Sequence, residues 1–200
     1  MLIKPKHLRY GDTIATVSPS NGWAGDTDIS WKYSLGVTRL KELFGLHTIS
    51  APNSLRGSDY LRKNPQARAE DIMLAFTNPE VKAIIANIGG NDSINIIPFI
   101  NTNVIKNNPK VFIGYSDVQN IHILCYKAGL STFYGDNLLT NIAETPYMHP
   151  YSERWFRKVL FDPSPIGLIE PSKNWTYEDI DFIYRRHTRI FLSRKSPNFF

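Results

Sequence analysis

Hydrophobic positions along the chain alternate between short apolar runs and stretches with helical spacing. Short apolar runs are typical of strands buried in a parallel sheet, whereas apolar residues three or four positions apart indicate amphipathic helices. We predict strands at residues 13–17, 46–50, 81–86, 111–113 and 131–134, and helices near residues 30–44, 64–78, 93–100 and 118–128. This alternation predicts an α/β fold, with an open, mostly parallel sheet and helices on both faces.

The strand–helix rhythm weakens after about residue 145. A helix is predicted at residues 153–160 and a strand at residues 166–169, while the last 20 residues, rich in Arg, Phe and Ser, show no clear period. We therefore expect an α/β domain at residues 1–165. Residues 166–200 are expected to begin an inter-domain linker and to end in an atypical tail.

Two glycine-marked turns, Gly89–Asp92 and Gly114–Asp117, follow the third and fourth predicted strands. Both turns lie at the carboxyl ends of strands, where open parallel sheets bind their ligands. In the second turn, Ser116 stands between an apolar strand and a helix, which is the arrangement of a nucleophile elbow. The helix start supplies free amides and a positive partial charge that suit an oxyanion. Ser116 is therefore a candidate nucleophile, with the Asp117 amide and the Gly-Gly turn as candidate oxyanion donors.

The spacing alone leaves two interpretations of Ser116 open. A nucleophile elbow usually reads Gly-x-Ser-x-Gly, and here Val118 occupies the last position. Ser116 and Asp117 could instead be an N-cap and a first-turn acid, a common pairing at helix starts. The Gly89–Gly90 turn could likewise cradle a phosphate, although neither a lysine nor a third glycine completes a phosphate-binding signature.

Composition and charge argue against several other classes of protein. The formal net charge is +5, but Lys and Arg are scattered and form no basic stripe between aromatic residues, which argues against nucleic-acid binding. No apolar run approaches the roughly 18 residues of a membrane span, and no signal peptide is visible. The single cysteine, Cys125, excludes an internal disulfide and a cysteine-based zinc site. These features predict a cytoplasmic protein without membrane or nucleic-acid partners.

Several of these motifs resemble those of the LD-carboxypeptidase family of serine peptidases. The block Asn108–Asp117, with Asn-Pro-Lys and Gly-Tyr-Ser-Asp, is the most specific part, and it lies between Ile88–Asp92 and Thr132–Gly135. The opening stretch, Gly11–Ala15 before Ser18–Ser20, is similar to that family's first strand and loop. The resemblance covers most of the chain and is closest to the microcin C immunity branch.

The resemblance implies a flavodoxin-like N-terminal domain and a defined set of roles. Ser116 would be the nucleophile, and the backbone amides of Gly90 and Asp117 would form the oxyanion hole. The glutamate and histidine that complete the family's triad come from a separate C-terminal domain. The implied reaction is hydrolysis of an amide bond near a free carboxylate, in a murein tetrapeptide or in a peptidyl or aminoacyl nucleotide. It needs no metal and no organic cofactor.

The chain departs from the family where the C-terminal domain should begin. Asn174–Asp179 resembles the start of the linking loop, but the expected Glu-bearing and His-bearing elements do not follow by residue 200. None of the five histidines is placed to replace the missing base, and His122 lies six residues beyond Ser116 on the same predicted helix. We therefore expect a truncated form with little or no turnover. Its exposed inter-domain surface could pair two copies of the chain.

Two further interpretations of function remain open. One is a non-catalytic remnant that keeps a ligand-binding cleft without turnover. The other is a flavodoxin-like nucleotide binder unrelated to hydrolysis. A fluorophosphonate separates a working hydrolase from both, because it labels a serine only where a base and an oxyanion hole are assembled.

Overall fold

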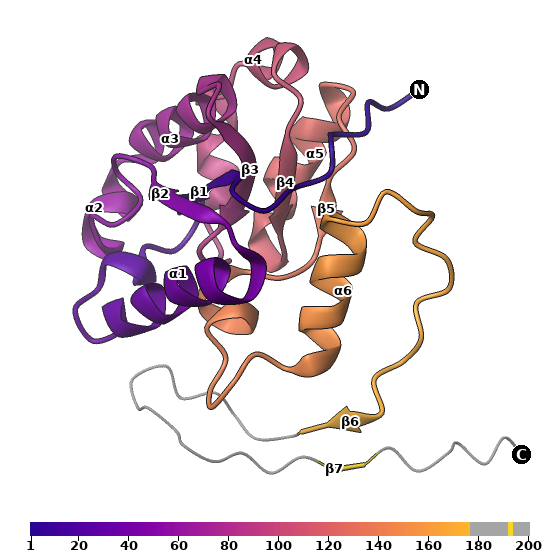
Figure 1. Cartoon of the computed structure of the whole chain (residues 1–200). Helices are drawn as coiled ribbons and strands as arrows, with labels where there is room; N and C mark the ends of the chain where they lie inside the picture. Colours follow the sequence, from indigo (N-terminus) through magenta and orange to yellow (C-terminus); the bar gives the residue numbers. More distant parts are fainter. Residues whose placement is uncertain (177–191, 194–200) are drawn as a thin grey trace, which may run out of the picture.

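The computed structural model describes residues 1–176 and 192–193. Its body is a parallel sheet of five strands in the order β2-β1-β3-β4-β5 (Figure 1). The strands are β1 (Thr13–Val17), β2 (His47–Ser50), β3 (Val81–Ala86), β4 (Val111–Gly114) and β5 (Phe133–Tyr134). The prediction of an open parallel sheet is confirmed.

Helices cover both faces of this sheet, because successive side chains on a strand point to opposite faces (Figure 1). On β3, Ile84 and Ala86 belong to one hydrophobic core, and Ala83 and Ile85 belong to another. The first core lies beneath α3 (Pro65–Thr77), η2 (Ser93–Phe99), α4 (Thr102–Asn107) and α5 (Gln119–Lys127). The second lies beneath α1 (Ser30–Phe44), η4 (Leu138–Ile142) and α6 (Pro150–Leu160).

The departures from the predicted elements have local causes. The predicted helix at residues 93–100 is the 3₁₀ helix η2, which contains Pro98, and proline lacks the amide donor of an α-helix. The predicted strand at residues 166–169 is wrong, because this segment is exposed and irregular. Gly167 has a φ of 72°, which interrupts an extended backbone. Hydrophobic spacing also misses the short helices η1 (Trp23–Gly25), α2 (Ser58–Lys63) and α4.

The chain beyond α6 runs largely exposed along the outside of the domain. There β6 (Asn174–Trp175) pairs antiparallel with β7 (Leu192–Ser193). Residues 177–191 and 194–200, with His187 and most of the predicted atypical tail, lie outside the described residues. The division of the chain at residue 165 therefore stays a prediction.

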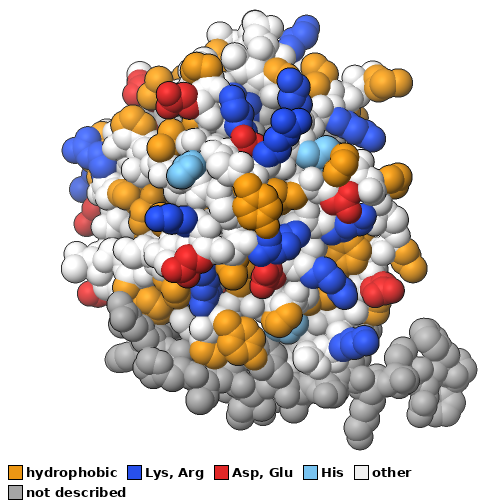
Figure 2. Space-filling view, viewed as in Figure 1, with side chains coloured by type: hydrophobic (Ala, Val, Ile, Leu, Met, Phe, Trp, Pro, Cys, Tyr) orange, Lys and Arg blue, Asp and Glu red, His pale blue; other side chains and the backbone are white. Residues whose placement is uncertain are grey.

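Basic side chains are scattered over the visible face of the molecule, as they are along the sequence (Figure 2). Figure 2 shows Lys and Arg side chains dispersed over one face among acidic, hydrophobic and uncharged groups. Within the described ranges, no helix has both the length and the apolar character needed to cross a membrane.

The loops that follow the strands meet at the carboxyl edge of the sheet. The Asn21 amide donates to the Gly89 carbonyl at 3.1 Å, which joins the loops after β1 and β3. The Gly135 amide donates to the Gly114 carbonyl at 3.1 Å, which joins the ends of β5 and β4. Segments far apart in the sequence are thereby brought together around the turn after β4.

Candidate active site

Ser116 lies between β4 and α5, at the start of the short 3₁₀ helix η3 (Ser116–Val118). Its φ of 65° makes it the only non-glycine residue with a positive φ in the described part of the chain. That conformation costs on the order of 1–2 kcal/mol and persists only where surrounding contacts impose it. The Ser116 residue is exposed. The structure therefore places Ser116 on the predicted strand-to-helix turn, with backbone strain of the kind found at functional sites.

The Gly89–Gly90 turn lies beside Ser116. A Cβ on Gly89 would be 2.8 Å from Ser116 Cβ and 3.0 Å from Ser116 Oγ, so only glycine permits this approach. A Cβ on Gly90 would overlap the hydroxyl of Ser20. The Gly90 amide donates no backbone hydrogen bond within the described ranges, and the Asp117 amide lies in the first turn of η3, where amides have no partner within the helix. Both amides therefore stay candidate oxyanion donors.

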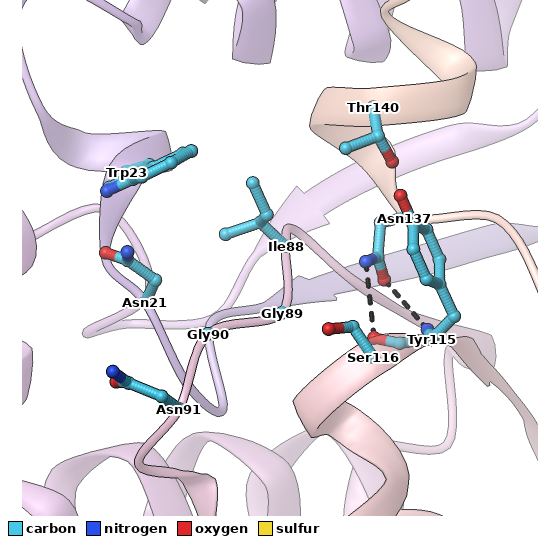
Figure 3. A pocket seen from close by; sticks show the side chains of 10 residues that line it. All are labelled: Asn21, Trp23, Ile88, Gly89, Gly90, Asn91, Tyr115, Ser116, Asn137 and Thr140. Atoms are coloured by element: carbon cyan, nitrogen blue, oxygen red, sulfur yellow. Dashed lines mark hydrogen bonds between the residues drawn. The ribbon is translucent and has the colours of Figure 1, made fainter.

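A cavity of about 410 Å³ opens in front of Ser116. In Figure 3 the Ser116 hydroxyl points toward the Gly89–Gly90 backbone, with Trp23 on one side of the cavity and Tyr115 on the other. None of the residues that line this cavity has a charged side chain; they are Asn21, Trp23, Ile88, Gly89, Gly90, Asn91, Tyr115, Ser116, Asn137 and Thr140. The described wall therefore suits an uncharged part of a ligand.

Tyr134, at the end of β5, and Asn137, three residues later, hold the strained turn in place. The Asn137 side chain accepts from the Tyr115 amide at 3.2 Å and donates to the Tyr115 carbonyl at 3.5 Å (Figure 3). The Ser116 amide donates to the Tyr134 hydroxyl at 3.0 Å. Asn137 is buried, so its two hydrogen bonds face little competition from water.

The Asp117 carboxylate connects the turn to the loops after β1 and β3. It accepts from the Ser20 hydroxyl at 2.6 Å and from the Ser93 amide at 2.8 Å. Burial tends to raise the pKa of Asp117, but the hydrogen bonds from Ser20 and Ser93 outweigh burial, and the pKa is lowered. The carboxylate is therefore charged at neutral pH and anchors both loops.

A partly buried ion pair lies behind this carboxylate. Arg68 Nη1 is 2.9 Å from Asp92 Oδ1, and the Arg68 side chain is 0% exposed. The same nitrogen donates to the carbonyls of Pro19 and Ser20 at 3.1 and 3.2 Å. Arg68 thus holds the loop after β1 against the loop that carries Gly90.

His122, the histidine nearest to Ser116 in sequence, is a packing residue as predicted. Its Nε2 lies 2.8 Å from the Gly114 carbonyl and its Nδ1 lies 2.8 Å from the Thr132 hydroxyl. Because a carbonyl only accepts, Nε2 carries the proton and Nδ1 accepts from Thr132. Burial lowers the pKa of His122, which keeps the ring neutral. With both nitrogens occupied, His122 has no free nitrogen to act as the base for Ser116.

No hydrogen bond joins the Ser116 hydroxyl to a base, or to any other residue, within the described ranges. His7 and His47 are exposed elsewhere, and His149 is the N-cap of α6. No cluster of His, Cys, Asp or Glu suited to a metal ion occurs in the part of the chain that the structure describes.

The sequence singles out Ser116, Gly90 and Asp117 as candidates, but not the side chains that hold this turn in place. Tyr134 and Asn137 stand at the end of the last strand of the sheet, so the carboxyl-edge rule could have pointed to them. No sequence pattern points to Arg68. It lies on the buried face of α3, where helical periodicity predicts an apolar residue.

Comparison with known proteins identifies similar sequences. The family model of the LD-carboxypeptidase N-terminal domain matches residues 14–135. A probable murein peptide carboxypeptidase of Bacillus subtilis is 31% identical over 179 residues, which cover 85% of this chain and 54% of the relative. The microcin C7 self-immunity protein MccF of Escherichia coli is 29% identical over 177 residues, which cover 88% of this chain and 51% of the relative.

A solved structure gives the same fold. The MccF-like protein from Streptococcus pneumoniae, in complex with AMP, superimposes with a TM-score of 0.83 at 33% sequence identity. The superposition covers 92% of this chain and 55% of that chain. The chain therefore spans about half the length of the relatives that it matches.

Proposed function

Because this chain belongs to the LD-carboxypeptidase family, we propose that it supplies the nucleophile of a serine hydrolase that cleaves an amide bond near a free carboxylate. The observation that carries the proposal is the strained, exposed turn at Ser116 beside the Gly89–Gly90 backbone. An N-cap serine needs no positive φ and no glycine pressed against its hydroxyl, so these features favour the nucleophile over the capping interpretation.

The proposed reaction begins when Ser116 Oγ loses its proton to a base and attacks the carbonyl carbon of the scissile amide. The carbonyl oxygen becomes an oxyanion, which accepts hydrogen bonds from the Gly90 and Asp117 amides. The intermediate then expels the amine, which takes the proton from the base, and an acyl group stays on Ser116. Water, activated by the same base, hydrolyses this ester and restores the serine.

The base is the part of the reaction that the described residues do not supply. The family resemblance assigns it, with its orienting glutamate, to a C-terminal domain. We therefore expect slow turnover by residues 1–200 alone. Loss of triad members costs up to about 10⁶ in kcat, while the oxyanion hole and substrate binding retain roughly 10³–10⁴ over water.

Two classes of substrate are consistent with the relatives. The Bacillus subtilis relative is described as a murein peptide carboxypeptidase, and the Streptococcus pneumoniae structure contains AMP. We propose a small peptide of one of these two kinds, a murein LD-peptide or a peptidyl or aminoacyl nucleotide. The uncharged wall of the cavity supports binding of a neutral group next to Ser116.

The second candidate is a binding domain that keeps this cavity without turnover. It is favoured by the lack of a base that contacts Ser116 within the described ranges. A flavodoxin-like nucleotide binder unrelated to hydrolysis has no comparable support, because the chain belongs to a peptidase family.

Fluorophosphonate labelling separates the hydrolase from the binding domain. We would compare this chain with a version extended by a relative's C-terminal domain, each also as Ser116→Ala. Ser34→Ala is the matched control, because Ser34 is exposed on α1 and its hydroxyl bonds only within that helix. The hydrolase predicts rapid labelling of Ser116 in the extended protein and slow labelling in this chain. An unlabelled extended protein would favour the binding domain, and rapid Ser116-dependent labelling of this chain would refute the missing base.

We also propose a cytoplasmic location and self-association. Cys125 is free and buried, and burial raises the pKa of its thiol to about 12, as suits a cysteine that forms no disulfide. Leu168 and Ile169 are 87% and 58% exposed beyond α6, which is apolar surface that a second copy could cover. Size-exclusion chromatography at several concentrations tests the pairing, and a mass that stays monomeric at high concentration contradicts it.

A further inference from the structure

Tyr134 stands on the side of Ser116 opposite the Gly89–Gly90 turn. Strand β4, which leads into Ser116, lies between β3, which precedes the glycine turn, and β5, which contains Tyr134. The Tyr134 residue is 62% exposed, and its oxygen accepts from the Ser116 amide at 3.0 Å. The phenol oxygen is therefore within reach of a ligand bound at Ser116 Oγ.

The proton of this phenol is available to a ligand. A tyrosine hydroxyl has one donor and also accepts, and here the accepting role is taken by the Ser116 amide. No residue of the described ranges accepts the Tyr134 proton. The accepted bond comes from the start of a helix, where amides have a positive partial charge. Hydrogen bonds in series polarise one another, so this arrangement strengthens the phenol as a donor.

The ring is held in place although it is exposed. Its centroid lies 5.6 Å from that of His122, which is fixed by the Gly114 carbonyl and the Thr132 hydroxyl. His122 also packs edge-on against Phe112 in the core, with the ring centroids 5.1 Å apart. Tyr134 thus rests on a buried platform, and little side-chain entropy is lost when its hydroxyl meets a ligand.

We propose that the Tyr134 hydroxyl donates a hydrogen bond to a carboxylate of the substrate, on the side of Ser116 away from the oxyanion hole. This inference rests on the proposed function, which places a free carboxylate near the scissile amide. The oxyanion is proposed to lie beside the Gly89–Gly90 turn. The Tyr134 hydroxyl lies on the opposite side of Ser116, so it would meet a different acceptor group of the substrate. A carboxylate is the acceptor that gains most from a single donor, because charge-assisted bonds are about twice as strong as neutral ones. Tyr134 is then a specificity-determining residue.

Calorimetry in the Ser116→Ala chain tests this inference without turnover. The probes are a murein tetrapeptide and the same peptide with its C-terminal carboxylate amidated. Tyr134→Phe removes only the hydroxyl and should weaken binding of the free acid by about tenfold or more, while binding of the amide stays within about twofold. Tyr126→Phe is the matched control, because Tyr126 is 66% exposed on α5 and its hydroxyl makes no hydrogen bond with the described residues. It should change neither affinity.

The outcomes distinguish this inference from the proposed function. Unchanged preference for the acid in Tyr134→Phe, or equal weakening of acid and amide, overturns the role of Tyr134 and leaves the Ser116 labelling result untouched. A parent chain that binds neither peptide, or binds both equally, also overturns it. Circular dichroism verifies that Tyr134→Phe is folded. If it is not, ring signals of ¹³C-tyrosine in the parent chain serve instead, and the Tyr134 signal should shift with the acid but not with the amide.

Discussion

The Ser116 turn is held by two groups of residues of opposite character. The charged side consists of Ser20, Arg68, Asp92, Ser93 and Asp117, joined by an ion pair and by carboxylate hydrogen bonds. The neutral side consists of His122, Thr132, Tyr134 and Asn137, which make uncharged hydrogen bonds with the backbone of the turn or, for His122 and Thr132, with each other.

The two sides also face different parts of the proposed reaction. The charged side fixes the loop whose Gly90 amide is proposed to donate to the oxyanion. The neutral side contains the Tyr134 hydroxyl, which is proposed to bind the substrate carboxylate. Removing the buried cation of an ion pair usually destabilises a protein more than removing a neutral hydrogen bond. The comparison therefore predicts that damage to the charged side shows mainly as lost stability, and damage to the neutral side mainly as lost ligand discrimination.

The largest effect is expected from Arg68→Met. This change leaves Asp92 without its partner and removes the hydrogen bonds from Arg68 to the carbonyls of Pro19 and Ser20, so the free energy of unfolding should fall by about 2–4 kcal/mol. Urea denaturation measures the loss. Adding Asp92→Asn should recover part of it, because the unpaired charge is removed. A loss below about 1 kcal/mol would contradict the anchoring role of the pair.

Asp117→Asn should destabilise by about 2 kcal/mol at neutral pH, since the carboxylate accepts from both Ser20 and Ser93. The folded-state pKa of Asp117 is lowered, so its stabilisation is complete above about pH 4 and is lost as the pH falls through the folded pKa. The difference in unfolding free energy between parent and variant should therefore shrink below about pH 4. A difference that is constant from pH 7 to pH 3 would show that the carboxylate is not the anchor.

His122→Gln gives the corresponding test of the neutral side, with a loss of about 1–2 kcal/mol at pH 7. The pKa of buried His122 is lowered, so the parent is fully stabilised above about pH 6.5 and loses stability as the pH falls below that value. The unfolding free energy of the His122→Gln variant should lack this fall below about pH 6.5. Asp136 titrates oppositely in the same range, because burial raises its pKa to about 6, so the difference between the two proteins is the quantity to compare. Parallel pH curves for parent and variant would refute the neutral buried ring.

The smallest effect is a gain in stability from Ser116→Gly. Glycine adopts a φ of 65° without the Cβ clash, so unfolding should become harder by up to about 1 kcal/mol, less the entropy that glycine adds to the unfolded chain. Ser34→Gly, in the interior of α1, is the control with the opposite sign and should cost about 0.5–1 kcal/mol. Destabilisation by Ser116→Gly of the same size as by Ser34→Gly would mean that the turn is not strained.

The sequence predicts the fold better than it predicts the two sides of the site. Strands β1 and β3 and helix α1 lie at their predicted bounds, because their apolar spacing is determined locally. Ser116 is found by its place between strand and helix, for the same reason. The contact between Arg68 and Asp92 depends on two loops meeting across the sheet edge, and no local period encodes it. The position of Tyr134 at the end of a predicted strand places it at the sheet edge, but its contact with the Ser116 amide depends on β5 lying beside β4.

Ser116 is proposed to attack the substrate, with the oxyanion on the glycine side of the turn. The most direct measurement is a crystal structure of the fluorophosphonate adduct of the chain extended by a relative's C-terminal domain. We expect phosphorus bonded to Ser116 Oγ, with one phosphonyl oxygen about 2.7–3.1 Å from both the Gly90 and the Asp117 amide nitrogens. An adduct on another residue, or a phosphonyl oxygen held by Tyr134 with neither amide in reach, would contradict it.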